Sequence, residues 1–133
     1  MSAPTFEAWR PRGESAGRPP SFDAWRLGDW LNEASDGRGY VPRERYDLAL
    51  RVLMAAGVTV SRAHLLLVAL VARAVEPSRR RPGLSWSAHR EVAVLDRAAQ
   101  DRFLDLAERE GLTCHKLRDA VRALALDTER AAA

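Results

Sequence analysis

The chain has 133 residues, of which 47% are hydrophobic and 29% are charged, and its net charge is +3. This length suits one domain, and this composition excludes a wholly disordered chain. A single cysteine excludes an internal disulfide, and no apolar run approaches the ~20 residues that span a bilayer. Because no basic and apolar leader opens the chain, we expect a cytoplasmic protein that is not associated with a membrane.

The positive charge is concentrated in the middle of the chain. Residues 41–97 carry ten arginines and five acidic residues, a net charge of +5, whereas residues 1–40 and 98–133 each carry a net charge of −1. A guanidinium donates two parallel hydrogen bonds to a phosphate, so this concentration favours a nucleic-acid partner. A GC-rich genome also enriches arginine and alanine, and the bias alone does not distinguish the two origins.

Residues 1–20, MSAPTFEAWRPRGESAGRPP, contain prolines and glycines that disfavour a helix. We predict that this segment is a flexible N-terminal arm that is extended or partly disordered. Its aromatic residues, Phe6 and Trp9, are expected to dock the arm onto the rest of the domain.

The remainder of the chain, residues 21–130, has the apolar spacing of helices and no sustained alternation typical of a strand. Six helices are predicted, each beginning at or after a residue that favours a helix start: Ser21, Pro42, Thr59, Ser85, Asp96 and Thr113. Their predicted ends lie at Asp36–Gly37, at Gly57, before Pro77 and at Gly111. The expected fold is therefore all-α, with one helical domain over residues 21–130.

Two of these helices are joined by a tight turn that contains glycine, which is the pattern of a helix-turn-helix. The segment is YDLALRVLMAAGVTVSRAHLLL, in which Ala56 to Val58 form the turn and Thr59 begins the second helix. Gly57 suits the turn because glycine adopts the left-handed conformation at little steric cost. We therefore predict a helix-turn-helix over about residues 46–75, with its second helix as the recognition helix.

The predicted recognition helix is polar at its start and apolar afterwards. TVSRAH provides hydroxyls, a guanidinium and an imidazole, whereas LLLVALV is apolar on every side and is expected to be surrounded in a core or subunit interface. The expected DNA-contacting residues of this helix are Thr59, Ser61, Arg62 and His64. Arg62 can bind a guanine edge through two hydrogen bonds, and Ser61 and His64 can reach bases or phosphates. The alternative is a plain helical hairpin whose first turn is solvated.

The segment EPSRRRPGLSWSAH places three consecutive arginines before a Pro-Gly turn. One interpretation is a solvated helix end, where the cations oppose the helix dipole. The other interpretation places Arg79, Arg80 and Arg81 on DNA phosphates beside the recognition helix, where they fix orientation without reading sequence. In that case the N-terminus of the following helix, with Ser87, can bind another phosphate.

Two parts of the chain resemble the LmbU family of actinobacterial transcriptional regulators. WRLGDWLNEASDGRGYVPRERYDLAL resembles the family's W-x-L-G-D-W-L segment and the tyrosine-rich helix that follows it. EPSRRRPGLSWSAHREVAVLD and AEREGLTCHKLRDAV resemble its basic turn, its Leu-Ser-Trp-Ser helix and its closing helix pair. The likeness covers about residues 6–125, and it implies a DNA-binding regulator of transcription.

More distantly, residues 57–126 resemble the DNA-binding helical domain of ParB-type partition proteins, which implies a ParB/KorB-like helix-turn-helix domain. In that domain a Gly-x-Ser turn begins the recognition helix, and a later Leu-Ser-x-x-His segment contacts the DNA backbone. The histidine of that segment corresponds to Ala88 here, and His89 follows one place later, so His89 does not inherit the role. The nucleotide-binding half of ParB has no counterpart, and neither CTP hydrolysis nor clamp sliding is implied.

The other polar and aromatic residues have structural interpretations. Three tryptophans on apolar stripes are expected in the core or an interface: Trp25, Trp30 and Trp86. His89 is expected to be a hydrogen-bonded packing histidine, and Asp105 to form an i,i+4 surface pair with Arg109. Cys114 and His115 lack the spacing of a metal site, and no P-loop, nucleophile elbow or dinucleotide fingerprint occurs. We therefore expect no metal, cofactor or catalytic site.

The leading hypothesis is a sequence-specific DNA-binding transcriptional regulator that is not an enzyme. It is expected to bind double-stranded DNA as a homodimer on a two-fold-related site. A helical protein-interaction adaptor, whose apolar LLLVALV helix docks a partner, is the first alternative. A plasmid or phage partition accessory protein, which binds DNA for segregation, is the second.

Overall fold

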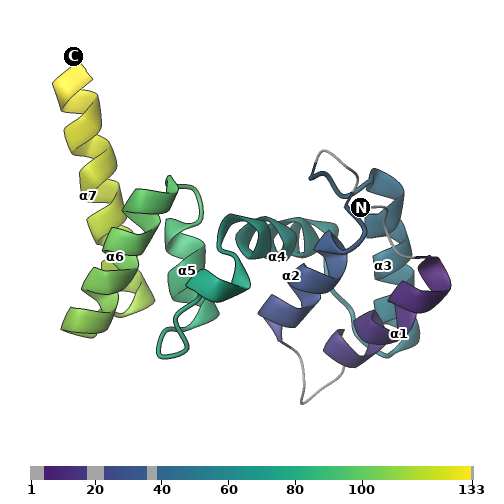
Figure 1. The fold of residues 1–133 in the computed structure, drawn as a ribbon. Helices are drawn as coiled ribbons and strands as arrows, with labels where there is room; N and C mark the ends of the chain where they lie inside the picture. The colour runs from purple at the N-terminus through teal and green to yellow at the C-terminus, as the bar shows by residue number, and fades with distance from the viewer. Residues whose placement is uncertain (1–4, 18–22, 36–38, 133) are drawn as a thin grey trace. The chain divides into compact units, whose positions relative to one another are not determined.

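The computed structural model describes residues 5–17, 23–35 and 39–132, and the chain divides into two compact units, residues 1–73 and 74–133 (Figure 1). Throughout the described ranges the secondary structure is helical, with seven α-helices, one short 3₁₀-helix and no strand. The prediction of an all-α fold is confirmed. The predicted number of six helices is too low by one within the described residues, because the N-terminal segment is also helical.

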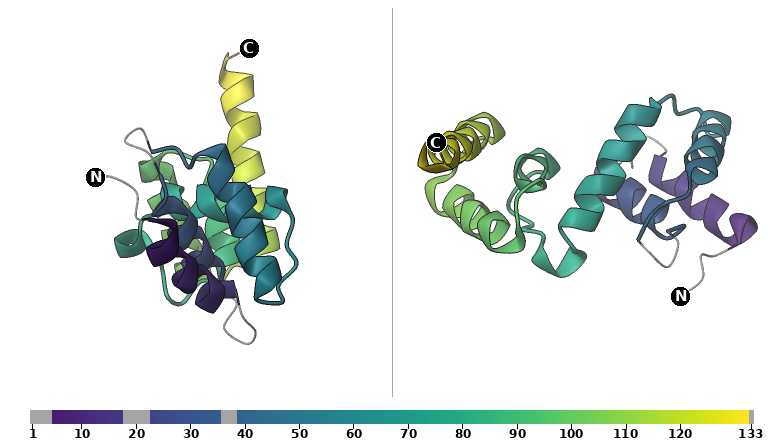
Figure 2. Two further views of the ribbon diagram at one scale, coloured as in Figure 1. Left: turned by 90° about the vertical axis from the view of Figure 1, so that its right-hand side faces the viewer. Right: turned by 90° about the horizontal axis from the view of Figure 1, so that it is seen from above.

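The described residues of unit 1 form four helices: α1 (Phe6–Gly17), α2 (Ala24–Asn32), α3 (Arg43–Ala55) and α4 (Arg62–Ala74), whose last residue belongs to unit 2. Unit 2 continues with four more elements: η1 (Pro77–Arg79), α5 (Trp86–Val92), α6 (Arg97–Glu110) and α7 (Cys114–Ala132). In the views of Figures 1 and 2, α1 lies beside α2 and α3. The segment expected to form one domain, residues 21–130, is thus divided between the two units.

Helix α1 corrects the expectation of an extended arm. Trp9 is completely buried, and its ring stacks on the ring of Trp30 in α2, with the ring centroids 4.1 Å apart. The Trp9 indole N–H donates to the Trp30 carbonyl oxygen at 2.5 Å, and the Trp30 indole N–H donates to the Trp9 carbonyl oxygen at 2.6 Å. This tertiary contact satisfies both buried donors and outweighs the poor helix propensity of Pro11 and Gly13. The predicted docking of Trp9 is confirmed.

Two glycines of unit 1 occupy positions where a side chain has no room. A Cβ at Gly13 would lie 2.0 Å from the Trp30 ring, and a Cβ at Gly28 would lie 2.3 Å from the Val68 carbonyl oxygen in α4. Gly28 therefore lets α2 and α4 approach each other closely. The Leu-Gly-Asp-Trp-Leu motif at residues 27–31 thus builds the core of unit 1, because both of its leucines are also completely buried.

The helix starts agree with the predicted capping residues in most places. Ser85 and Asp96 cap α5 and α6 by accepting a backbone N–H from three residues later, at 3.2 and 2.8 Å. Thr113 does the same for α7 at 3.2 Å. Helix α2 is capped by Asp23, whereas the predicted cap, Ser21, lies outside the described residues together with the rest of the predicted arm at residues 1–4 and 18–20.

The core of unit 2 lies between α5, α6 and α7. Its buried side chains are Ala88, Val92, Phe103, Leu104, Ala107 and Leu117. Gly111 closes α6 with a φ of +62°, as predicted. Helix α7 extends beyond α5 and α6, so residues 125–131 at its end are exposed (Figures 1 and 2).

Candidate nucleic-acid interface

Helix α3 ends as predicted at a left-handed glycine. Gly57 has a φ of +85°, and its N–H donates to the Met54 carbonyl oxygen at 3.0 Å. The Val58 N–H donates to the Leu53 carbonyl oxygen at 2.8 Å. These two bonds form a Schellman motif, in which glycine takes the left-handed position without a steric penalty. Helix α3 therefore ends at Gly57, the residue that the sequence predicts.

Helix α4 begins at Arg62 and not at Thr59, so the predicted start is wrong. The Ser61 hydroxyl oxygen accepts the His64 N–H at 3.0 Å, which makes Ser61 the capping residue. Residues 58–60 are all β-branched and favour extended backbone, so they lengthen the connection between the two helices. The connection over residues 56–61 is longer than the three or four residues of the usual helix-turn-helix turn.

The predicted DNA-contacting residues of unit 1 lie together at this end of α4. Thr59 and Ser61 are exposed, and Arg62 and His64 are partly exposed. The Arg62 Nη1 lies 3.2 Å from Oδ1 of Asp47 in α3, and their side chains are 35% and 53% exposed. The beginning of α4 therefore presents hydroxyls, a guanidinium and an imidazole at the surface of unit 1.

The apolar part of α4 is buried on one side. Its buried residues are Leu65, Val68, Ala69, Val71 and Ala72. Leu66 and Leu70 keep 45% and 41% of their surface exposed. Within the described residues, the chain's own core therefore does not surround these two leucines, and their burial in a subunit interface stays a prediction.

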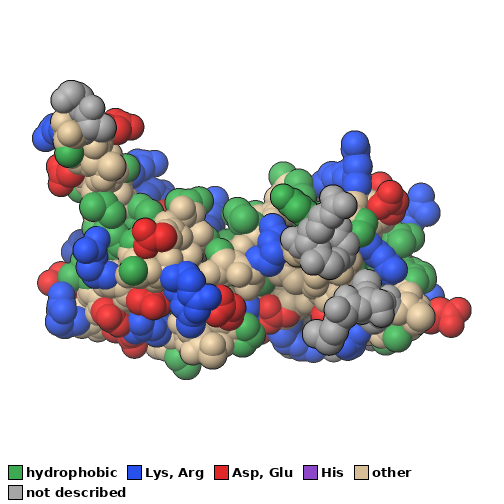
Figure 3. Space-filling model, turned by 45° about the horizontal axis from the view of Figure 1, so that its top comes forward, with side chains coloured by type: hydrophobic (Ala, Val, Ile, Leu, Met, Phe, Trp, Pro, Cys, Tyr) green, Lys and Arg blue, Asp and Glu red, His purple; other side chains and the backbone are tan. Residues whose placement is uncertain are grey.

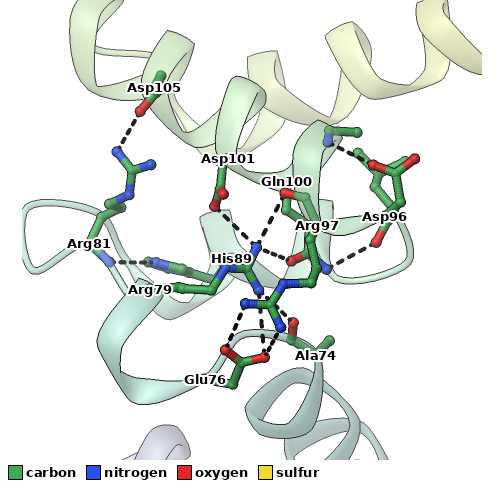
Figure 4. Close-up of polar contacts among 12 residues, drawn as sticks. Ala74, Glu76, Arg79, Arg81, His89, Asp96, Arg97, Gln100, Asp101 and Asp105 are labelled. Atoms are coloured by element: carbon green, nitrogen blue, oxygen red, sulfur yellow. Dashed lines mark hydrogen bonds and ion pairs between the residues drawn. The ribbon is translucent and has the colours of Figure 1, made fainter.

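Unit 2 places Arg79 inside the protein (Figure 4). Its side chain is 11% exposed, and its Nη2 donates to Gln100 Oε1 at 2.7 Å and to Asp101 Oδ1 at 3.0 Å. Its Nη1 donates to the Ala74 carbonyl oxygen at 3.3 Å. A guanidinium held in this way would have to break these contacts to bind a phosphate. The expected phosphate contact of Arg79 is therefore replaced by a cross-link between η1 and α6.

Arg81 is also held by α6 (Figure 4). Its Nη1 lies 2.7 Å from Asp105 Oδ1 and also contacts the Glu108 carboxylate. Asp105 was expected to pair with Arg109, but it pairs with Arg81 instead. Arg80 is half-buried, and its Nε donates to a backbone carbonyl oxygen at 2.8 Å. The carboxylates of α6 thus neutralise charge that the triplet was expected to present to DNA.

Sequence reasoning did not pair the acidic face of α6 with Arg79 and Arg81. Asp101, Asp105 and Glu108 are spaced by four and three residues, and this spacing places them on one face of a helix. The pattern predicts that they share a face, but it does not show that Arg79 and Arg81 lie opposite them. On the face drawn in Figure 3, basic and acidic side chains are interspersed.

His89 is completely buried in unit 2, with both ring nitrogens in hydrogen bonds. Its Nδ1 lies 2.8 Å from the Ser85 carbonyl oxygen, and its Nε2 accepts the Arg81 N–H at 3.0 Å. These partners assign the proton of the neutral ring to Nδ1. Burial, followed by the positive charges of Arg80 and Arg81, lowers the pKa of His89. The prediction of a hydrogen-bonded packing histidine is confirmed.

Ser87 lies in the first turn of α5, a helix of seven residues, and its side chain is half-buried. The Ser85 hydroxyl oxygen already accepts the Ala88 N–H at this helix end. The phosphate contact of Ser87 stays a prediction.

Two other kinds of site have no counterpart in the described ranges. Across these residues, no group of His, Cys, Asp and Glu side chains is arranged to hold a metal ion. None of the helices built from them is both long enough and apolar enough to cross a membrane.

The chain is similar to a curated regulator of transcription, with 34% identity over 119 residues that make up 90% of the chain. That relative is the transcriptional regulator NovE of Streptomyces niveus. The match covers 51% of NovE, so the chain spans about half the length of this relative. No protein-family model matches the chain, and no solved structure matches it. The match does not test the ParB-like domain.

Proposed function

We propose that the chain is a sequence-specific DNA-binding regulator of transcription and that it is not an enzyme. The similarity to NovE, which covers 90% of the chain, carries this proposal. The exposed beginning of α4 supports it, because hydroxyls, a guanidinium and an imidazole are the groups that contact base edges and phosphates. Since the chain spans about half of NovE, the proposal is confined to DNA recognition by the residues present here.

In this proposal α3 and α4 act as a helix-turn-helix, and α4 is the recognition helix. Thr59, Ser61, Arg62 and His64 face the major groove, where Arg62 donates two hydrogen bonds to a guanine edge. Arg62 must then exchange the Asp47 carboxylate for the base. Exposed ion pairs contribute about 0–1 kcal/mol, so the exchange costs little.

The ion pairs of unit 2 restrict the proposed phosphate contacts. Arg79 and Arg81 are bound to carboxylates of α6, and we leave them out of the interface. Arg80 and Ser87, which are both half-buried, stay as proposed phosphate contacts on either side of the Pro-Gly turn.

We also propose that the protein binds DNA as a homodimer. Helix-turn-helix proteins commonly bind two half-sites about one helical turn apart, so that the symmetry of the operator matches that of the protein. Light scattering of the protein, free and on DNA, measures the stoichiometry. A monomer in both states would remove the dimer and leave the DNA-binding proposal intact.

One observation favours a second candidate function, a helical protein-interaction adaptor. Met54 in α3 and Leu66 and Leu70 in α4 are large apolar side chains with 68%, 45% and 41% of their surface exposed. Apolar surface of this kind suits contact with another protein. An adaptor of this kind would use the same helix pair without entering a DNA groove.

In-vitro selection from a pool of random DNA duplexes tests the proposed function. We expect enrichment of one motif, in the form of a gapped palindrome if the protein is a dimer. A parallel selection without protein controls for amplification bias. If no motif is enriched over that control, the proposal of sequence-specific DNA binding is wrong and the adaptor is favoured.

A further inference from the structure

Unit 2 has a basic notch between α5 and α7 that the proposed function does not use. Its lining residues are Arg90, Glu91, Val94, Arg118, Val121 and Arg122, and its volume is about 440 Å³. The notch is open and shallow, and α6 contributes no lining residue. We call it the α5–α7 notch.

The α5–α7 notch carries a net positive charge. Its three arginines and one glutamate give a local charge of +2, whereas the whole of unit 2 has eleven basic and ten acidic residues, a charge of +1. Glu91 is neutralised because Arg118 donates to its Oε1 from Nε at 3.1 Å and from Nη2 at 2.8 Å. Arg90 and Arg122 are exposed, and no described residue forms an ion pair with either.

The internal ion pairs of unit 2 occupy several of its other arginines. Arg79 and Arg81 bind the carboxylates of α6, and Arg97 binds Glu76 at 2.8 Å. In each of these pairs the positive and the negative charge neutralise each other inside the unit. The guanidinium groups that stay available to an outside partner therefore include the two on the α5–α7 notch.

We propose that the α5–α7 notch binds the phosphate backbone of double-stranded DNA, with Arg90 and Arg122 each contacting one phosphate. A planar guanidinium matches the oxygens of a phosphate, and the hydrogen bonds between Arg118 and Glu91 join the two helices that line the notch. This contact rests on the proposed function and adds a sequence-independent anchor to base recognition by α4.

An acidic protein surface would complement the same charge, but the notch fits DNA better. Only two of its lining side chains are apolar, Val94 and Val121. Stable protein interfaces are built around a well-packed, desolvated centre that is rich in large side chains. Two valines are too few to form such a centre.

The salt dependence of DNA binding tests the proposal. The double variant Arg90→Gln/Arg122→Gln is compared with the parent by fluorescence anisotropy, using a labelled duplex of random sequence at several salt concentrations. Losing two phosphate contacts lowers the slope of log K against log salt by about 1.8. Between 50 and 200 mM salt, the parent then loses about tenfold more affinity than the variant loses.

A matched control separates the notch from net charge. Arg109→Gln/Arg130→Gln removes two exposed arginines of unit 2 that do not line the notch, and its slope is expected to equal that of the parent. Circular dichroism checks that both variants fold like the parent. The proposal is overturned if the notch variant keeps the parental slope, or if the control loses as much slope as the notch variant.

The same data distinguish failure of the notch from failure of the proposed function. If the parent prefers no sequence but its salt slope still depends on Arg90 and Arg122, base recognition by α4 is wrong and the notch stands. If the parent prefers an operator and the notch variant keeps the full slope, the notch is wrong and the proposed function stands. No DNA binding by the parent at all overturns both.

Discussion

Unit 1 is stabilised by close packing of aromatic and small residues, whereas unit 2 is stabilised by hydrogen bonds and ion pairs around a smaller core. In unit 1, Trp9 stacks on Trp30, and Gly28 lets two helices approach each other. In unit 2, a buried His89 and an almost buried Arg79 connect separate segments. The difference predicts that unit 1 responds mainly to changes in side-chain volume, and unit 2 mainly to changes in charge and pH.

The largest expected effect is that of Trp9→Ala in unit 1. The substitution removes a completely buried ring and leaves the Trp30 carbonyl oxygen without the Trp9 indole N–H that donates to it. We expect the free energy of unfolding to fall by about 3–5 kcal/mol, as measured by urea denaturation. Phe6→Ala, at a half-buried ring beside Trp9, is the control and should cost clearly less. Equal losses would mean that the Trp9 stack does not anchor α1.

A second test of the packing in unit 1 is Gly28→Ala. The added methyl group would lie 2.3 Å from a backbone oxygen of α4, which cannot move aside as a flexible side chain can. We expect the free energy of unfolding to fall by about 3 kcal/mol, which is at the upper end of the range typical of overpacked cores. Gly83→Ala is the matched control, because a Cβ there meets no atom within 4 Å and its backbone is not left-handed. A Gly28→Ala variant as stable as the control would contradict the close approach of α2 and α4.

In unit 2, Arg79→Ala tests whether the guanidinium is a structural cross-link. The change removes hydrogen bonds to Gln100, Asp101 and two backbone oxygens, and we expect unit 2 to lose about 2 kcal/mol of stability. Arg97→Ala removes an ion pair in which the arginine side chain is 68% exposed, and it should have little effect. If both variants unfold at the same denaturant concentration as the parent, the cross-link does not stabilise unit 2.

The smallest expected effect is a pH dependence that originates in His89. Its pKa is lowered in the folded state, so between this pKa and about 6.5 the unfolded chain binds more protons than the folded chain. The contribution of neutral His89 to the free energy of unfolding is therefore present above about pH 6.5. It is lost as the pH falls towards the folded pKa, by at most about 1.4 kcal/mol per pH unit. We compare urea denaturation of the parent and of His89→Gln from pH 7.5 down to pH 5. A parent curve parallel to that of the variant would show that His89 does not titrate as described.

Short-range chemistry explains which parts of the fold could be predicted from the sequence. Ser85 and Asp96 begin helices because each side chain accepts an N–H three residues later, and Gly57 ends one because its backbone is left-handed. These interactions lie within a few residues, so the local sequence pattern contains them. The burial of His89 was likewise predictable from its place on an apolar helix face.

Contacts between residues that are distant in sequence explain the failures. Helix α1 depends on two hydrogen bonds between tryptophans that are 21 residues apart, and the local pattern around Pro11 gives no sign of them. Arg79 was expected to contact DNA. Its partner, Asp101, lies 22 residues away on another helix, so the local sequence does not reveal their pairing. The predicted exposure of Thr59 and Ser61 agrees with the structure, but the helix begins at Arg62 and not at Thr59, because Ser61 caps it.

The most direct test of the central claim measures base discrimination by Arg62. Binding of the selected operator and of its single-base-pair variants is compared for the parent, for Arg62→Ala, and for Arg51→Ala, which removes an exposed arginine of α3. We predict that Arg62→Ala loses about 1–3 kcal/mol of discrimination at one base pair of each half-site, while Arg51→Ala discriminates like the parent. Unchanged discrimination in Arg62→Ala at every base pair would contradict recognition of DNA by the start of α4.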